Sequence, residues 1–267
     1  MAYSSSLIND SAIGNSGYGT GSPYFTEEQL ALLDKTKMPA HIAIIPDGNR
    51  RWAKANTLNI TQGHRKGANN LITIVKAAKA VGIKSITFFL FSTENWTREK
   101  REVRALMWIL ESFLIEQRQA MIDQGIRFHT IGDLTKFSDR VIRVLEESKQ
   151  ATAHCNTIDM VAALNYGGRD EITRAIKSLL EDFERTKFKK EAINETLISK
   201  YLDTASWPDP ELLIRTSGEK RISNFLLWQI SYSEIYVTEV LWPEFTANHL
   251  LDALLYFQYR ERRLGGG

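Results

Sequence analysis

The sequence predicts an α/β fold: a single domain with a central, mainly parallel β-sheet flanked by helices. From Met38 onward, short runs of apolar and β-branched residues alternate with longer amphipathic segments, which is typical of βαβ units around a parallel sheet. Polar, glycine-bearing segments follow several of these runs, where the ligands of such sheets usually bind. No internal repeat or composition change divides residues 38–267, so we expect one domain there.

The first 37 residues differ from the rest. Residues 1–23 contain six Ser and four Gly with little apolar periodicity, which indicates a flexible extension. They lack the basic start and continuous apolar stretch of a secretory signal. Residues 26–37 are expected to form a short helix capped by Thr26. We therefore divide the chain into an extension at 1–37 and a folded domain at 38–267.

Six strands and six longer helices are predicted within the folded domain. The strands are short runs rich in β-branched and aromatic residues, at His41–Ile45, Ser85–Phe91, Ile126–Ile131, Ile158–Leu164, Leu212–Arg215 and Ile235–Thr238. The helices follow apolar spacings of three and four residues, at 64–81, 99–124, 136–153, 169–186, 194–201 and 247–263.

The predicted helix 99–124 has apolar residues on more than one face, with Trp108 and Ile115 outside its main stripe. A surface helix needs only one apolar face. The helix is therefore either enclosed in the core or a subunit interface, or it lines an apolar tunnel for a long hydrocarbon ligand.

Composition narrows the classes of protein. The 267 residues carry 34 Lys and Arg against 32 Asp and Glu, without the basic surplus that coating nucleic acid requires. A single cysteine, Cys155, excludes an internal disulfide and a cysteine-rich zinc site. No apolar run approaches the roughly 18 residues of a membrane span. We expect a soluble, cytoplasmic protein that does not bind nucleic acid.

The segment after the first predicted strand has the composition of an anion-binding turn. Asp47 ends the strand, and Gly48 and Asn49 tolerate positive φ before a helix begins. Backbone N–H groups at such a turn converge on an anion, and Arg50 and Arg51 add charge-assisted donors. A carboxylate beside a phosphate needs a bridging cation, so Asp47 predicts Mg²⁺. The alternative is an Asp-Gly turn with a purely structural role.

Further polar residues offer anion or metal contacts. Asn95 and Arg98 follow the second strand, where Thr97 is the alternative explanation as N-cap of the next helix. Arg215 ends the fifth strand, and arginine suits bidentate phosphate binding. The other candidates are Lys220, Arg221 and Ser223 after that strand, His64 at a helix start, and Glu234 as a second ligand for a hard cation.

Several familiar motifs are missing. The sequence has no phosphate-binding P-loop, dinucleotide fingerprint, HExxH or GxSxG motif. It also has no Asp-Asp dipeptide, so the DDxxD signature of trans-prenyltransferases is absent. The residues together indicate magnesium-assisted binding of two anionic groups beside an apolar channel. Diphosphates with hydrocarbon tails satisfy that description.

Five segments together resemble the cis-prenyltransferase family, which includes undecaprenyl diphosphate synthases and other isoprenyl transferases: HIAIIPDGNRRWA, FSTENWTR, NYGGR, LLIRTSGEKRISNFLLWQ and RERRLGGG, in order across residues 38–267. The resemblance implies a homodimer with a deep apolar tunnel and Mg²⁺ as cofactor. It implies condensation of isopentenyl diphosphate with an allylic diphosphate, usually farnesyl diphosphate, to a Z-polyprenyl diphosphate. The expected product is undecaprenyl diphosphate, a cell-wall carrier lipid, and its hydrophobicity implies peripheral membrane contact for release.

The resemblance also assigns roles to residues. Asp47 matches the magnesium ligand that assists departure of the allylic diphosphate, Glu234 a second magnesium ligand, and Asn95 the residue proposed to help remove the proton. An amide is a poor base, so positioning, or proton uptake by the leaving diphosphate, is physically easier. The implied substrate contacts are Gly48, Asn49, Arg50, Arg51, Trp52 and His64 for the allylic diphosphate; Arg98, Arg215, Arg221, Ile222 and Ser223 for isopentenyl diphosphate; Ser92, Thr93, Glu94 and Trp96 beside Asn95; and Arg263 and Gly265 of the C-terminal R-x-G, which completes the neighbouring subunit's site.

Three positions depart from the family pattern. Arg50 stands where many bacterial members have glycine, and Ile60 where an additional arginine is common. Leu90 is bulkier than the alanine often found there in long-chain members, so a tunnel-lining Leu90 predicts a shorter product. A shorter-chain synthase is therefore a competing hypothesis.

Two more hypotheses belong to different classes of protein. A non-catalytic partner subunit of a heteromeric prenyltransferase would retain the fold, but such subunits usually lose the aspartate and much of the arginine set. Asp47, Arg215 and Arg221 are all present here, which favours catalysis. An unrelated magnesium-dependent phosphotransferase is the last hypothesis.

Overall fold

The computed structural model describes residues 22–186 and 190–260. Its six strands form one sheet in the order β3-β4-β2-β1-β5-β6, and every neighbouring pair is parallel. The strands are β1 (His41–Ile45), β2 (Ser85–Ser92), β3 (Ile126–Ile131), β4 (Ile158–Tyr166), β5 (Leu212–Arg215) and β6 (Glu234–Val237). The predicted parallel sheet and all six predicted strands are confirmed.

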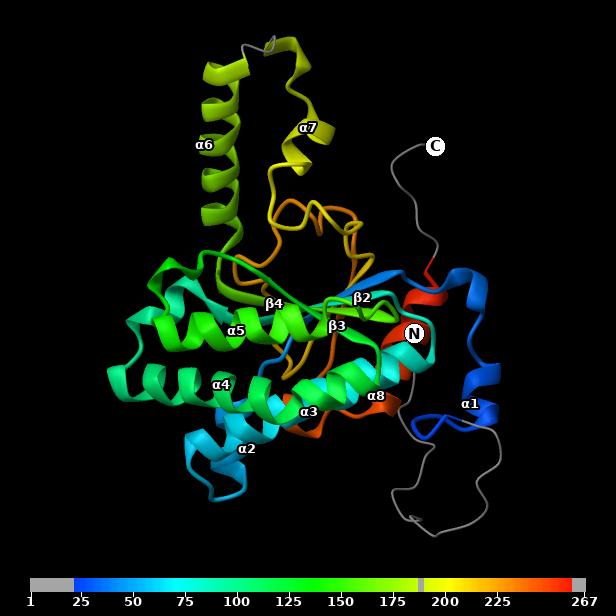
Figure 1. Cartoon of the computed structure of the whole chain (residues 1–267). Coiled ribbons are helices and arrows are strands. Elements are labelled where there is room, and N and C mark those ends of the chain that lie inside the picture. The colour runs from blue at the N-terminus through cyan, green and yellow to red at the C-terminus, as the bar shows by residue number, and fades with distance from the viewer. Residues whose placement is uncertain (1–21, 187–189, 261–267) are drawn as a thin grey trace.

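Helices cover the two faces of the sheet unequally. One face carries α3 (Ile60–Ala80), α4 (Lys100–Asp123), α5 (Asp139–Thr152) and α8 (Ala247–Gln258), which lie below the sheet in Figure 1. Their apolar residues pack with Ile42, Ile44 and Phe88 in the larger core cluster. The other face packs against a smaller cluster that includes Phe225 and Leu226 from the segment after β5.

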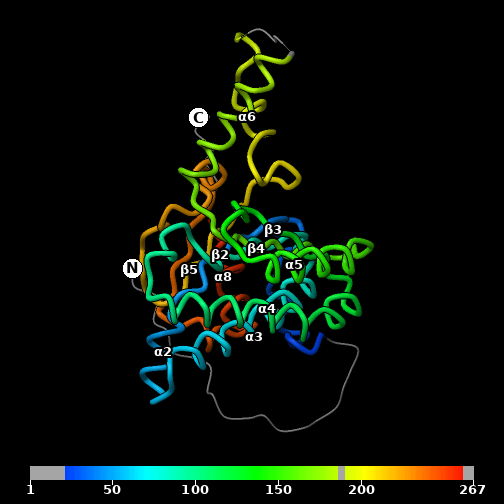
Figure 2. The backbone as a smooth tube through the Cα atoms, turned by 60° about the vertical axis from the view of Figure 1, so that its left-hand side comes forward, coloured from blue at the N-terminus to red at the C-terminus, as the bar shows by residue number. Residues whose placement is uncertain are grey.

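The pair α6 (Gly168–Thr186) and α7 (Glu195–Ser199) projects away from the body of the domain, as Figures 1 and 2 show. The two faces of α6 differ in burial: Ala175 and Leu179 are buried, whereas Ile176 and Leu180 are about half exposed. One face of α6 therefore presents apolar side chains to solvent.

Several boundaries differ from the predictions for local reasons. The expected helix 26–37 is α1 (Glu27–Ala31) followed by a 3₁₀ turn at Lys35–Lys37, because the Asp34 side chain accepts the Thr36 N–H and starts the second element. Thr26 caps α1 as predicted. The helix expected from 64 begins at Ile60, where Asn59 and Gln62 form a capping box. Helix α8 ends at Gln258, and residues 261–263 of the range expected for it lie outside the described residues.

Two segments have a structure that the ranges predicted from the sequence do not include. Residues 22–37 belong to the predicted extension, but they pack on the domain: Phe25 is buried in the core, and Asp34 N donates to Gln258 Oε1 at 3.1 Å. A short helix, α2 (Asn49–Ala55), follows β1 directly. None of the helices formed by the described residues is both long and apolar enough to cross a membrane.

Candidate active site

Three loops from neighbouring strands meet at one edge of the sheet. Because β2, β1 and β5 are adjacent and parallel, the segments after their carboxyl ends converge. They surround a cavity of about 520 Å³ together with α3 and α4. The loops contribute the polar part of its lining, called the mouth below: Asp47, Gly48, Asn49, Arg50, Arg51, Ser92, Asn95, Arg98, Arg215, Glu219, Arg221 and Ser223.

Asp47 and Arg215 form an ion pair in this cavity. Arg215 Nη2 lies 2.8 Å from Asp47 Oδ2, and Arg215 Nη1 donates to Ser223 Oγ at 2.9 Å and to the Arg221 carbonyl oxygen. The second carboxylate oxygen of Asp47 accepts the Gly48 N–H at 2.7 Å. The Arg215 side chain is only 5% exposed. The loops after β1 and β5 are therefore joined through one buried guanidinium, which orients the Asp47 carboxylate.

The start of α2 approaches α3 unusually closely. A Cβ atom added at Gly67 would lie 2.1 Å from Asn49 Oδ1, and one at Gly63 would lie 2.3 Å from the Asn49 carbonyl oxygen. Gly48 has a φ of +109°, which strains any residue with a side chain. These glycines let the turn after Asp47 lie against α3 at the cavity wall.

Three polar atoms of the cavity residues are buried without hydrogen-bond partners: Asn49 Oδ1, His64 Nε2 and Arg215 Nε. Buried polar atoms in folded proteins are nearly always paired. Their concentration at one cavity indicates a site built for a polar ligand.

The arginines at the mouth outnumber the carboxylates with which they pair. Arg98 and Arg50 share Glu102, at 2.9 and 3.8 Å. Arg51 lies 3.6 Å from Glu219, and Arg221 also pairs with Glu219. Four guanidinium groups with two carboxylates leave a positive surplus, which attracts a multiply charged anion.

His64 is held neutral in the ligand-free protein. Burial lowers its pKa to about 4, and the guanidinium of Arg98 acts in the same direction. We expect an NMR titration to show this low pKa, and to show a higher value when inorganic pyrophosphate occupies the cavity, because a nearby anion favours the imidazolium. A pKa near 6.5 in the free protein would contradict the geometry.

The lowered pKa of His64 also makes the free energy of unfolding depend on pH. Because the folded pKa lies below the unfolded value of about 6.5, the unfolded chain takes up the proton first as the pH falls. The contribution of His64 to folding is therefore present above pH 6.5 and lost between about 6.5 and about 4. Thermal unfolding across that range, compared with a His64→Gln variant, measures the contribution.

The other part of the cavity lining, called the inner end below, is apolar. It comprises Ala68, Leu71, Phe89, Leu90, Phe91, Leu106, Met107, Leu110, Phe113 and Leu164. Leu90 lies at a register shift of β2, between Phe89 paired with Ala163 and Phe91 paired with Leu164. Such irregularities re-aim side chains, and here three consecutive residues line one cavity. Helix α4 is enclosed in the core in part, since Phe113 and Leu114 are buried, and its residues Leu106, Met107 and Leu110 line the cavity. A tunnel for a long hydrocarbon ligand stays a prediction.

Several predicted contact residues point elsewhere. Trp52 Nε1 donates to Glu244 at 2.8 Å. Trp96 Nε1 donates to Asn165 at 2.7 Å, and its ring packs edge-on against Phe91. Glu94 accepts from Asn224. None of these three predicted residues lines the described cavity, and neither do Thr93 and Ile222. Thr97 is not the N-cap of α4, since Glu99 takes that place.

Glu234 and Asp47 of the same chain lie far apart in the folded structure. It begins β6 and pairs with Leu212, which pairs with Ile42 on β1. Asp47 is five residues beyond Ile42, so the two carboxylates are separated along the strands by on the order of 15 Å. Glu234 instead lies 3.2 Å from Arg260. One chain therefore does not bring the two expected metal ligands together. Arg263 and Gly265 lie outside the described residues.

Two carboxylates of the site were missed by the sequence predictions. Glu219 lies inside a segment quoted for the family resemblance and Glu102 in the first turn of α4, but neither was singled out as a site residue. Only the fold places them beside the arginines. One sequence signal could have indicated their role: each of these carboxylates lies close in sequence to arginines.

An arginine-rich mouth, a fixed aspartate and an apolar interior at the carboxyl edge of a parallel sheet define a site for a diphosphate with a hydrocarbon tail. A family described as "Putative undecaprenyl diphosphate synthase" matches residues 45–265. The chain therefore belongs to the undecaprenyl diphosphate synthase, or cis-prenyltransferase, family, and it is an enzyme that transfers prenyl groups.

Individual relatives agree with this assignment. The isoprenyl transferase of Chlamydia trachomatis (serovar D) is 47% identical over 89% of this chain and 98% of its own length. That of Clostridium perfringens is 44% identical over 90% and 94%. Among solved structures, lavandulyl diphosphate synthase from Lavandula x intermedia, in complex with dimethylallyl diphosphate, has a TM-score of 0.84 and 34% identity, covering 86% of this chain and all of its own. A probable undecaprenyl diphosphate synthase from Campylobacter jejuni has a TM-score of 0.72 and 32% identity, covering 85% and 99%.

Proposed function

We propose that the protein extends farnesyl diphosphate with successive isopentenyl diphosphate units to a Z-polyprenyl diphosphate, with undecaprenyl diphosphate as the product. The observation that carries the proposal is the Asp47–Arg215 pair at the junction of the arginine-rich mouth and the apolar cavity. A diphosphate at the mouth would direct its hydrocarbon tail toward Leu90 and Phe113 inside.

The two diphosphates are assigned, following the family resemblance, to two neighbouring sets of residues at the mouth. Arg50 and Arg51, on the segment after β1, bind the allylic diphosphate. Arg98, Arg221 and Ser223 bind isopentenyl diphosphate. Developing negative charge on the departing allylic diphosphate is stabilised by the fixed arginines, whose positions cost no reorganisation during the reaction.

The residues present fit a magnesium ion at Asp47. This carboxylate is one-third exposed at the cavity mouth, and no group of three His, Cys, Asp or Glu suited to a metal occurs among residues 22–186 and 190–260. Magnesium commonly takes one or two carboxylates and completes its shell with water and substrate phosphates. When bound, Mg²⁺ neutralises charge on the diphosphate.

Asn95 acts as a hydrogen-bond donor in this scheme. Its side-chain oxygen already accepts the Ser92 N–H at 3.1 Å, which leaves its NH₂ group for the cavity that Asn95 lines. In each condensation a carbon–carbon bond forms, the allylic C–O bond breaks, and one proton leaves isopentenyl diphosphate. The departing diphosphate accepts that proton, and the Asn95 NH₂ group orients the diphosphate by donating a hydrogen bond to it.

Leu90 is expected to limit chain length. Removing its isobutyl group enlarges the apolar end of the cavity, so Leu90→Ala should shift the products toward longer chains by one or more isoprene units. Reversed-phase chromatography of the dephosphorylated products measures the shift, and Leu32→Ala, which changes an exposed leucine that lines neither this cavity nor the cleft between α2, α3 and α4, is the control. An unchanged product distribution would remove Leu90 from the length-determining wall.

We also propose that a second copy of the chain packs against the exposed apolar face of α6, so that the protein is a homodimer. Ile176 and Leu180 on α6 are 51% and 52% exposed, and Ile235 on the edge strand β6 is 45% exposed. Exposed apolar groups of this kind mark interaction surfaces. Light scattering should give twice the 30.5 kDa chain mass, and Leu180→Asp should lower it; a monomeric wild type would refute the dimer.

The outer cleft between α2, α3 and α4 is proposed to face a membrane during product release. It has a volume of about 1270 Å³, and its lining includes Lys54, Arg65 and Trp108. Sedimentation with anionic vesicles, compared with neutral ones, tests the contact; equal recovery in the supernatant with both would exclude it.

The reaction itself is tested with purified protein, farnesyl diphosphate, labelled isopentenyl diphosphate and Mg²⁺. Butanol-extractable, labelled polyprenyl product is expected, and its chain length separates an undecaprenyl from a shorter-chain synthase. No product under these conditions would favour a non-catalytic subunit. Transfer of phosphate from a labelled nucleotide instead would indicate a phosphotransferase.

A further inference from the structure

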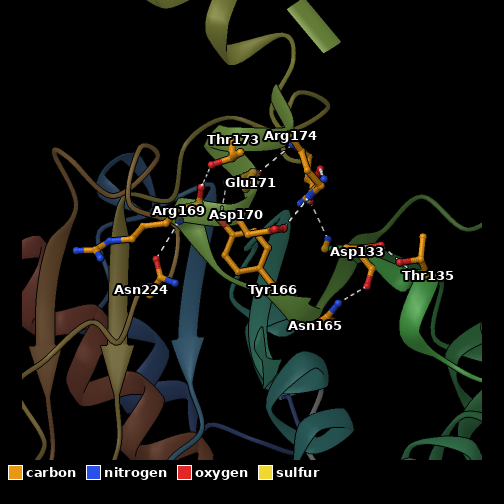
Figure 3. Close-up of polar contacts among 12 residues, drawn as sticks. Asp133, Thr135, Asn165, Tyr166, Arg169, Asp170, Glu171, Thr173, Arg174 and Asn224 are labelled. Carbon is orange, nitrogen blue, oxygen red and sulfur yellow. Dashed lines mark hydrogen bonds and ion pairs between the residues drawn. The ribbon is translucent and has the colours of Figure 1, made fainter. Parts of the chain in front are cut away.

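Asn224 joins three loops that follow different strands. Its side-chain oxygen accepts the Arg169 N–H at 3.0 Å, after β4, and its amide nitrogen donates to Glu94 Oε1 at 3.2 Å, after β2. Its main-chain oxygen accepts the Gly168 N–H at 2.7 Å. Figure 3 shows Asn224 beside Arg169 at this junction. Asn224 itself follows Ser223, a residue of the cavity mouth.

The backbone is adapted to this junction. Ser223 and Asn224 have φ values of 52° and 64°, a left-handed conformation that costs most residues energy but suits asparagine better than most. A Cβ atom added at Gly167 would lie 2.7 Å from Asn224 Nδ2 and 2.8 Å from Thr93 Oγ1. Glycine at 167 therefore allows the three loops to approach one another.

Glu94 is ionised when it accepts the hydrogen bond from Asn224. Desolvation opposes ionisation, but hydrogen bonds from its own backbone N–H and from Ser92 and Asn224 hold its pKa below the usual value. Glu94 lies in the 3₁₀ turn Thr93–Thr97, which presents Asn95 to the cavity. The contact with Asn224 therefore fixes one side of that turn.

Buried polar groups hold the neighbouring segments in place. Glu171, in the first turn of α6, is 1% exposed and accepts from Tyr166 Oη at 2.5 Å and from Gln229 Nε2 at 3.0 Å. Figure 3 shows Tyr166 and Glu171 next to the Arg169 segment. Because Gln229 follows Asn224 closely in the chain, these contacts restrain both sides of the junction.

We propose that Asn224 is a positioning residue that sets the spacing between the 3₁₀ turn Thr93–Thr97, with Arg98 at its end, and the Arg221–Ser223 loop. The inference rests on the proposed function, in which those two segments hold isopentenyl diphosphate together. Loss of the Asn224–Glu94 hydrogen bond is expected to disturb that substrate more than the allylic diphosphate, which is bound after β1.

Exchanging the donor and the acceptor tests the contact. Asn224→Asp places a carboxylate against Glu94 while still accepting the Arg169 N–H. We expect kcat to fall by about 10- to 10²-fold, with a several-fold rise in KM for isopentenyl diphosphate and little change in KM for farnesyl diphosphate. Adding Glu94→Gln supplies an amide donor to the new carboxylate, and it should restore most of the activity. Asn248→Asp, at an exposed asparagine that accepts from Gln29, is the matched control.

The outcomes separate this inference from the proposed function. A double variant as impaired as Asn224→Asp, or equal changes in both KM values, would overturn the positioning role. If the wild type forms no polyprenyl product, the proposed function fails. Calorimetric titration with inorganic pyrophosphate then still measures whether the double variant recovers the affinity that Asn224→Asp loses, and absence of recovery would refute the coupling.

Discussion

Asp47→Ala is expected to reduce kcat by about 10²- to 10³-fold or more, because it removes the carboxylate that Arg215 orients in the cavity. Asp47→Asn should be nearly as inactive. It preserves the size of the side chain and an acceptor for Gly48 N–H, but it loses the negative charge that a magnesium ion requires. Single-turnover assays with labelled isopentenyl diphosphate over a range of Mg²⁺ concentrations measure both variants.

The stability of these variants must be followed separately. Without Asp47 the buried guanidinium of Arg215 keeps only neutral acceptors, which costs about 1–3 kcal/mol. Thermal unfolding monitored by circular dichroism should therefore show folded proteins with lower midpoints. Asp34→Ala, at an exposed aspartate that does not line the cavity, is the control for activity. Activity in Asp47→Ala within twofold of the wild type would refute the role of this residue.

Arg215→Lys is expected to lower kcat/KM by about 10²-fold although the charge is retained. The planar guanidinium contacts Asp47 through Nη2 and Ser223 through Nη1, and lysine cannot reproduce this fork from a single nitrogen. Both the carboxylate and the Ser223 loop should lose their fixed positions. Steady-state assays that vary each diphosphate in turn measure the effect.

Arg185→Lys is the matched control for this substitution. Arg185 pairs with Asp182 at 2.7 Å, but its side chain is 77% exposed on α6, where an ion pair contributes little to stability. We expect unchanged kinetics in this variant. Arg215→Lys with kinetics like those of Arg185→Lys would show that charge alone, and not the fork geometry, is required at position 215.

Periodicity and strand-end chemistry were sufficient to predict much of the fold and the position of the site. All six strands were predicted because buried parallel strands are short apolar runs between amphipathic helices. The cluster formed by Asp47, Arg98 and Arg215 was also predictable, because Arg215 ends a strand and the other two lie in segments that follow neighbouring strands of one parallel sheet. Leu90 was expected in the cavity wall, and the structure places it there.

The direction of individual side chains was not predictable in the same way. Trp96 and Glu94 flank Asn95 in sequence, yet a 3₁₀ turn directs Trp96 to Asn165 and Glu94 to Asn224. Local sequence places such residues near the site, whereas contacts with segments more than 60 residues away decide which of them line the cavity.

Asp47 and Glu234 show where the sequence reaches its limit. The sequence alone determined the chemistry: two carboxylates, a set of arginines and apolar segments suited to a prenyl diphosphate. Only the tertiary structure decided that Asp47 follows the carboxyl end of β1 while Glu234 starts β6. The register of parallel strands separates residues that begin a strand from residues that end one, and register is a long-range property that neither carboxylate encodes by itself.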